Sequence, residues 1–189
     1  MPNAIHNWKM EGLTFELARP EHTKAIQAMR VASAAVLTAK LGLGHWSGST
    51  KFASIRERIK HADPEKLWAT TLHVACRDGE SIGSVTVSTY PPGFCRHTFW
   101  REGSEPGLGV FNLVVFPDFQ RQGIGLFLMK AVEQLALDHK IRFVRLDAYS
   151  ANPFSTAFYR AIGYDERTVI DLRGCGLVLY EKDVLPPIV

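Results

Sequence analysis

The chain has 189 residues, of which 46% are hydrophobic and 22% are charged. This length and apolar content predict a single folded domain and exclude a disordered or collagen-like chain. The formal charge is only +3, from 22 Lys and Arg against 19 Asp and Glu spread along the sequence, so we expect no nucleic-acid partner. No apolar run reaches the roughly 18–20 residues of a membrane span, and residues 1–7 do not resemble a signal peptide. We therefore expect a soluble, cytoplasmic protein with no membrane partner.

Hydrophobic patterns predict the elements of the N-terminal half. A strand over 13–18 is followed by a helix that starts near Pro20 and ends near Lys40, and then by a shorter helix from Phe52 to before Asp63. Two β-rich runs, 72–76 and 81–89, flank a turn sequence and predict a hairpin. The stretch 94–107 has no sustained periodicity and predicts a loop.

The C-terminal half contains the clearest helix. We predict a strand over 110–116 with both faces covered, this helix after Gln120, a strand over 143–149 and a closing hairpin of 168–172 with 177–180. Asn152-Pro153 predicts a short helix whose buried face comprises Phe154, Ala157, Phe158, Ala161 and Ile162. The order of these elements predicts an α/β (α+β mixed) fold, in which a central mixed sheet carries helices on both faces.

The loop before the clearest helix has the features of an anion site. A β-forming strand leads into Gln120-Arg121-Gln122-Gly123-Ile124-Gly125, and the helix starts there. Backbone N–H groups at a helix start and the helix dipole favour an anion, and the two glycines allow close approach to the main chain. A diphosphate is the ligand that we expect at this loop. The sequence contains neither a Rossmann fingerprint nor a P-loop, so the ligand is not predicted by either of those motifs. A helix that simply begins at Gly123 is the structural alternative.

Three cysteines, Cys76, Cys95 and Cys175, are widely separated and have no CxxC or paired Cys/His spacing. This arrangement predicts neither a disulfide framework nor a metal site.

Several of these segments together resemble the GCN5-related N-acetyltransferases (GNAT superfamily). The resemblance runs from about residue 108 to 182 and is carried by Val115-Phe116-Pro117, the Gln120–Gly125 turn, Asn152, and the box from Ala157 to Tyr164. It implies one GNAT-like domain over 1–189, with a mostly antiparallel sheet. Residues 1–107 would form the acceptor-side half, and residues 108–182 the acetyl-CoA-binding and catalytic half.

The resemblance implies acetyl-CoA as co-substrate, with no metal. The residues that it assigns to cofactor binding are Leu113, Val114, Val115, Arg121, Gln122, Gly123, Ile124, Gly125, Leu126 and Asn152. The backbone of the first three would hold the thioester and pantetheine, and the loop would wrap the pyrophosphate. Asn152 has an alternative role, because an Asn before Pro at a helix start is also a simple cap.

Two side chains are candidates for acid–base chemistry. Tyr159 lies about 100° round its helix from Phe158, which predicts a position off the buried stripe, and its phenol would protonate or hydrogen-bond the departing thiolate. Asp147 is the candidate base for the acceptor amine, with Glu105 as a weaker choice. An ion pair between Asp147 and Arg145 is the structural alternative.

The acceptor itself is predicted only as a class. We expect acetyl transfer to a primary amine, by direct attack in a ternary complex, with a small molecule as the acceptor. The alternatives are a protein N-terminus or lysine, or a non-catalytic acyl-CoA-binding module of the same fold. Two aromatic pairs, His45-Trp46 and Phe99-Trp100, are candidates for walls of an acceptor pocket. The family resemblance also implies a possible homodimer.

Overall fold

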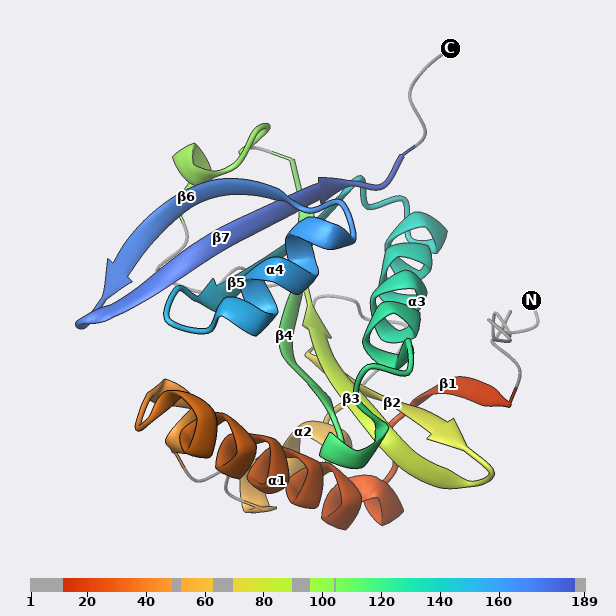
Figure 1. The fold of residues 1–189 in the computed structure, drawn as a ribbon. Helices are drawn as coiled ribbons and strands as arrows, with labels where there is room; N and C mark the ends of the chain where they lie inside the picture. Colours follow the sequence, from red (N-terminus) through yellow and green to blue (C-terminus); the bar gives the residue numbers. More distant parts are fainter. Residues whose placement is uncertain (1–11, 49–51, 63–69, 90–95, 104, 186–189) are drawn as a thin grey trace. The chain divides into compact units, whose positions relative to one another are not determined.

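The computed structural model describes residues 12–48, 52–62, 70–89, 96–103 and 105–185 (Figure 1). Seven strands are hydrogen-bonded in the order β1-β2-β3-β4-β5-β7-β6. They are β1 (Leu13–Leu17), β2 (Thr71–Arg77), β3 (Glu80–Ser88), β4 (Gly107–Val115), β5 (Phe143–Tyr149), β6 (Asp165–Leu172) and β7 (Cys175–Asp183). The helices of at least nine residues are α1 (Thr23–Leu41), α2 (Phe52–Lys60), α3 (Ile124–Asp138) and α4 (Pro153–Ala161). The predicted order of elements and the mixed sheet are confirmed. The predicted boundary at Asp63 and residues 94–95 of the predicted loop lie outside the described residues.

The chain divides into two compact units. The first contains residues 1–86 and 112–131, and the second contains residues 87–111 and 132–189. Each is described separately below.

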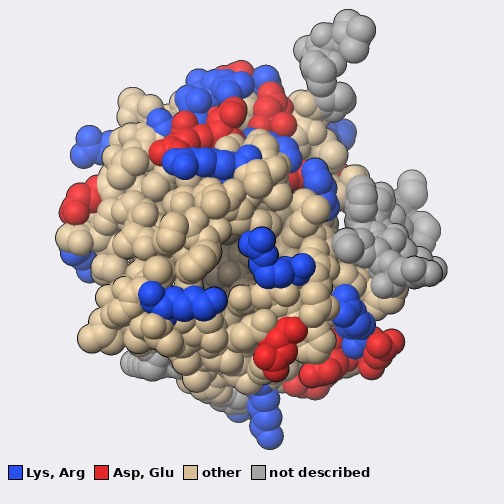
Figure 2. Space-filling view, in the orientation of Figure 1, with Lys and Arg blue, Asp and Glu red and all other residues tan. Residues whose placement is uncertain are grey.

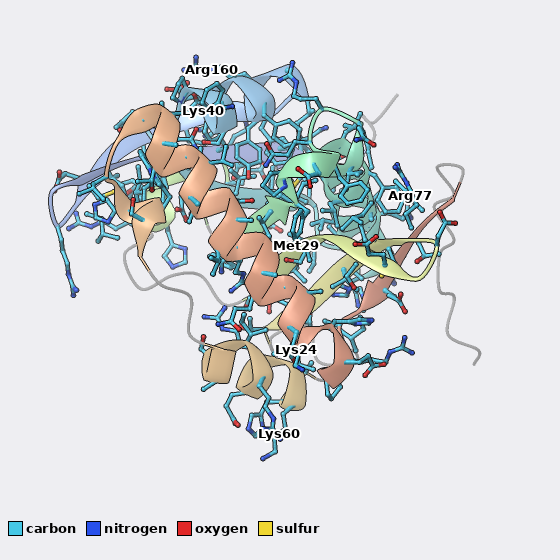
Figure 3. The ribbon with its side chains drawn as sticks, turned by 60° about the horizontal axis from the view of Figure 1, so that its bottom comes forward. Lys24, Met29, Lys40, Lys60, Arg77 and Arg160 are labelled. Carbon is cyan, nitrogen blue, oxygen red and sulfur yellow. The ribbon has the colours of Figure 1, made fainter. Side chains whose placement is uncertain are left out.

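The first unit has its core between α1, α2 and β2. Buried Ile26 and Met29 of α1 meet Ile55 of α2 and Leu72 and Val74 of β2. Figure 3 looks onto α1, with Lys24 and Lys40 toward its two ends and Met29 between them. Ile26 and Met29 are three residues apart and therefore lie on the same face of α1, which packs against β2. Strand β1 pairs antiparallel with β2.

A glycine in β3 allows α3 to pack closely within the same unit. A Cβ at Gly83 would lie 3.0 Å from Leu128 Cδ1 and 3.2 Å from Ile124 Cγ2. The helix predicted after Gln120 is confirmed, and Ile124, Phe127 and Leu128 in its N-terminal half are all buried.

In the second unit, β5 is the central strand. It pairs parallel with β4 through Gly107–Val110 and antiparallel with β7, which in turn pairs antiparallel with β6. Helix α4 packs on this sheet, where the ring of Tyr159 lies 5.7 Å from that of Tyr180 on β7. Figure 1 shows α4 in front of β5 and β7.

The prediction for β4 needs two corrections. The strand begins three residues earlier than predicted, at Gly107, and its alternation is interrupted at Asn112, whose φ is 49°. This left-handed conformation suits Asn better than most residues. Beyond it, residues 113–115 are half-buried, and Val114 packs against the buried core of the first unit, so the predicted cover of both faces is only partial in this segment.

The predicted buried face of α4 is also wrong. Phe154 is 53% exposed, and Ala157 and Ala161 are exposed, whereas Tyr159 is only 7% exposed. The inward face is rotated by about one residue and runs through Ser155, Tyr159 and Ile162. Ser155 can lie there because its hydroxyl donates to the Asn152 carbonyl, 3.1 Å away.

Two surface properties match the composition. Among the described residues, no helix is long and apolar enough to cross a membrane. Figure 2 shows Lys and Arg side chains interspersed with Asp and Glu on the face that it draws, as expected for a small net charge.

Candidate active site

The loop before α3 presents a row of backbone N–H groups. Arg121 and Gly123 both have positive φ, at 63° and 83°. This left-handed backbone conformation changes the direction in which the neighbouring N–H groups of the loop point. Within the described part of the chain, the N–H groups of residues 121–126 make no backbone hydrogen bond outside helices and strands, whereas Phe127 N–H donates to the Gly123 carbonyl at 2.9 Å. Successive N–H groups in such a turn form an anion-binding concavity. The N-terminus of α3 adds partial positive charge.

Side chains of the same unit fix this loop from behind. Gln122 Nε2 donates to the Asp118 carbonyl at 3.1 Å, and Gln122 Oε1 accepts from Arg77 at 3.1 Å. The Gln122 side chain is therefore structural, which leaves its backbone N–H for a ligand. Arg121 is exposed, so its charge can reach an anion from solvent.

Strand residues 113–115 lead into the loop. The Val115 carbonyl accepts from Ser33 Oγ of α1 at 3.2 Å and from Gln120 Nε2 at 3.1 Å. This carbonyl already has two donors, so a ligand contact at Val115 falls to other atoms of that residue. Sequence reasoning missed the role of Ser33, because one serine in a mostly apolar helix has no distinctive spacing.

Taken together, these first-unit residues fit a coenzyme A diphosphate. The oriented N–H groups supply neutral donors, the helix start supplies a favourable field and Arg121 supplies a formal charge. Leu113, Val114 and Val115 supply a half-buried apolar edge beside them.

In the second unit, Tyr159 lies in a cluster of aromatic rings. Its ring centroid is 5.2 Å from Phe158, 6.0 Å from Tyr164 and 5.7 Å from Tyr180. Burial, and then the nearby charge of Asp147, raise the pKa of Tyr159 far above its ordinary value. The phenol therefore keeps its proton at physiological pH and can donate a hydrogen bond. The prediction that this side chain lies off the buried stripe is wrong.

Asp147 is half-buried on β5. In the register of β5 with β7, Asp147 is paired with Leu179, and Leu146 is paired with the next residue, Tyr180. The Tyr180 ring contacts the Tyr159 ring. Because successive strand residues point to opposite faces, Asp147 and Tyr159 belong to opposite faces of this sheet. Burial raises the pKa of Asp147, which makes its carboxylate a stronger base.

The alternative of an Asp147–Arg145 ion pair is wrong. Arg145 Nε pairs instead with Glu181 Oε2 at 2.9 Å, and the Arg145 guanidinium also donates to the carbonyls of Glu102 and Glu105. Glu105 itself is exposed, with its backbone rather than its carboxylate engaged by Arg145.

Asn152 caps α4, as the alternative interpretation predicts. Its Oδ1 accepts from Phe154 N at 3.2 Å and from Ser155 N at 3.4 Å. A contact with coenzyme A therefore falls to the Nδ2 group and remains a prediction.

The two aromatic pairs pack on their own surroundings. Trp46 Nε1 donates to the Gly42 carbonyl at 3.2 Å, and a Cβ at Gly44 would lie 2.5 Å from the Trp46 ring. Trp100 stacks on Arg145, whose Cζ lies 5.1 Å from the ring centroid. Both tryptophans are explained by local packing, and a role in binding the acceptor stays a prediction.

One group of mixed donor atoms lies elsewhere in the first unit. Ligand atoms of Glu16, His22 and Cys76 lie within 4.8 Å of one another. Glu16 pairs with Arg19 at 3.3 Å, His22 Nδ1 accepts the Arg19 N–H at 3.0 Å, and burial raises the pKa of the Cys76 thiol to about 11. These contacts account for the cluster, and we assign no metal to it.

Comparison with known sequences gives the decisive observation. The sequence model described as the Acetyltransferase (GNAT) family matches residues 42–164. The chain belongs to the GNAT family of acetyltransferases. The match includes much of the N-terminal half, where the sequence resembles the family only in its element order.

Relatives within the family are distant. The [ribosomal protein bS18]-alanine N-acetyltransferase of Escherichia coli is 30% identical over 60 residues, and the match spans only 40% of that protein's length and 32% of this chain. A GNAT acetyltransferase from Streptococcus agalactiae superposes with a TM-score of 0.74 at 17% identity, covering 93% of this chain and 97% of that one. The YncA protein of Salmonella typhimurium, solved with its cofactor acetyl-CoA, gives 0.64 at 13% identity, covering 92% and 95%. These structures share the GNAT fold with this chain.

Proposed function

We propose that this acetyltransferase moves an acetyl group from acetyl-CoA to a small primary amine. The observation that carries the proposal is the row of backbone N–H groups at residues 121–126, which have no backbone acceptor among the described turns and loops. Such groups suit the diphosphate of the acetyl donor. The acetyl-CoA in the Salmonella structure of the same fold supports this choice of donor.

Each candidate residue has a defined chemical task. The backbone of residues 113–115 would position the pantetheine, and Arg121 would add charge at the diphosphate. The neutral Tyr159 phenol would donate a hydrogen bond to the thiolate that departs as acetyl transfer completes. Asp147 would accept the proton that the acceptor must lose before its nitrogen can attack.

A protein N-terminus is the second candidate acceptor. It is favoured by the curated relative, which acetylates an alanine of ribosomal protein bS18. That match covers less than half of either protein, so the two acceptor classes must be separated by experiment.

Release of coenzyme A thiol tests the proposed function. The chain is incubated with acetyl-CoA and each member of a panel of small primary amines and N-terminal peptides, while binding of acetyl-CoA is measured by calorimetry. Thiol release with at least one small amine is expected. Binding without release for every acceptor would instead identify a non-catalytic module, and release only with peptides would identify a protein acetyltransferase.

Gly125→Val tests the assignment of the diphosphate loop. A branched side chain in the first turn of α3 would obstruct approach to the backbone, so the Kd for acetyl-CoA is expected to rise about 10-fold to 10²-fold. Gly125 is the better position for this test because Gly123 has a φ of 83°, where any side chain also strains the backbone. Calorimetry gives the Kd, and thermal unfolding reports the stability.

The matched control is Gly48→Val. Gly48 is exposed, has an extended backbone, and an added Cβ would make only an ordinary 3.7 Å contact. It should leave the Kd unchanged. A folded Gly125→Val variant with the Kd of the native chain would remove the loop from the diphosphate site.

Asp147→Asn tests the proposed base. The variant is expected to lower kcat/KM by about 10²-fold near pH 7, because a carboxamide cannot accept the proton of the ammonium acceptor. Raising the pH supplies free amine and should restore much of the rate. The pH profile of kcat/KM is the measurement, and profiles that overlay would leave proton removal to water.

A further inference from the structure

The face of α1 that meets β3 carries an arginine with incomplete pairing. Arg30 is half-buried, and its Nε is buried without a hydrogen-bond partner in the part of the chain that the structure describes. Its Nη2 reaches Thr86 Oγ1 only at the long distance of 3.5 Å. Buried charged groups are normally paired, because removing them from water is costly.

The charges around Arg30 make an anion more favourable still. Burial, and then the positive charge of Arg58 on α2, lower the pKa of Arg30 to about 10. Among the described residues, no carboxylate forms an ion pair or a hydrogen bond with Arg30. The positive charge of Arg58 therefore adds to that of Arg30, and within the described ranges no carboxylate pairs with Arg30 to balance it.

Hydroxyl groups on β3 add donors on the same side. Ser84 and Thr86 are both fully buried, and they point to one face because they are two residues apart on a strand. The Ser84 Oγ is also buried without a partner among the described residues. Unsatisfied buried groups are rare in folded proteins, and here two of them occur on facing elements of one unit.

Helix α1 links this polar patch to the strand that would hold the pantetheine. Ser33 follows Arg30 by three residues, which is about 4.5 Å of helix rise, and its hydroxyl donates to the Val115 carbonyl. The patch therefore lies about one helical turn from β4.

We propose that Arg30, with the hydroxyl groups of Ser84 and Thr86, binds a carboxylate of the acceptor, so that the acceptor is an amino acid or a similar amine carboxylate. A guanidinium and two hydroxyls provide a fork of donors that suits a single planar carboxylate. This proposal is based on the proposed function and specifies the substrate class for that site.

Matched acceptors and variants test the carboxylate site. The probes are a panel of amino acids, each compared with its own carboxamide, which keeps the amine and removes the negative charge. With the native chain, kcat/KM is expected to favour the acid. Arg30→Met is expected to lower kcat/KM for the acid by about 10²-fold more than for the amide. Taking this ratio between enzymes cancels the different amine pKa values of acid and amide.

Two further variants complete the design. Thr86→Val keeps the side-chain volume, removes the hydroxyl and should reduce the same preference by a smaller factor. Lys24→Met removes an exposed charge from α1 and should change nothing. Equal losses for acid and amide in Arg30→Met would make Arg30 a structural residue and overturn the proposal.

Ligand binding without turnover separates this proposal from the proposed function. The panel members are added to the chain in the presence of coenzyme A, and the rise in Tm is recorded. A shift with acids but not amides, lost in Arg30→Met, supports the carboxylate site even if no acceptor is acetylated. The absence of any shift, together with acetylation of amines that lack a carboxylate, would refute it and leave the proposed function intact.

Discussion

Replacing Tyr159 by Phe is expected to lower kcat by about 10²–10³-fold, the usual loss when one donor to a developing negative charge is removed. The hydroxyl is the only group deleted, and the buried ring keeps its contacts with Tyr164 and Tyr180. Because the pKa of Tyr159 is raised, full proton transfer from this phenol is unfavourable, and hydrogen-bond donation is the role that we expect it to perform. The Kd for acetyl-CoA should be unchanged.

Single-turnover thiol release measures this effect without interference from product release. Tyr164→Phe is the matched control, because it removes a hydroxyl from the adjacent ring of the same cluster and is not assigned to catalysis. A Tyr159→Phe variant that retains the native kcat at saturating substrate would show that Tyr159 only packs, and that another group or a water donates to the thiolate.

Replacing Arg145 by Met is expected to lower the free energy of unfolding by about 3 kcal/mol, near the lower end of the usual cost of breaking a buried ion pair, because Arg167 Nε still lies 3.8 Å from Glu181 Oε1. The carboxylate left behind is that of Glu181, a residue with only 2% exposure. The substitution also removes the donors to the carbonyls of Glu102 and Glu105 and the stacking partner of Trp100.

Denaturant unfolding measures this loss. The double variant Arg145→Met with Glu181→Leu should recover part of the stability, since it removes the buried carboxylate, although Arg167 and the Arg101 N–H then lose Glu181 as their partner. Arg160→Met, which removes an exposed ion pair with Glu166, should leave the unfolding midpoint unchanged. An Arg145→Met variant as stable as the native chain would mean that Arg167 alone compensates the charge of Glu181.

The elements with strong local signals are those that the sequence predicts well. Helix α3 has an uninterrupted hydrophobic spacing, and β5 is found at the predicted residues, 143–149. The hairpin turns are also local, since Asp78-Gly79 and Arg173-Gly174 both adopt positive φ at their two central residues. In each case the residues that decide the structure are adjacent in the chain.

The features that the sequence did not predict depend on distant contacts. The orientation of α4 depends on Tyr180 of β7, because the Tyr159 ring packs against the Tyr180 ring on the sheet. The exposed side of α4 is apolar at Phe154, so hydrophobicity alone gave the wrong face. Similarly, nothing in the spacing of α1 reveals that Arg30 would face the buried hydroxyls of β3.

The candidate site divides in the same way. The loop proposed for the diphosphate could be recognised because its glycines and the following helix are contiguous in the sequence, and its role stays a prediction. The partner of Arg145 could not, because Glu181 is 36 residues further along the chain. Strand pairing between β5 and β7 brings the two together and leaves Asp147 outside the ion pair.

The contacts of Glu181 also predict how hydrogen exchange at a neighbouring loop amide depends on opening of the sheet in the second unit. Its Oε1 accepts the backbone N–H of Arg101, an exposed loop residue, at 3.1 Å, while its Oε2 holds Arg145 on β5. The amide proton of Arg101 is therefore protected by a carboxylate that is itself buried in the sheet. Its hydrogen exchange should follow the opening of β7 rather than local fraying of the loop, so that loop and sheet behave as one cooperative unit.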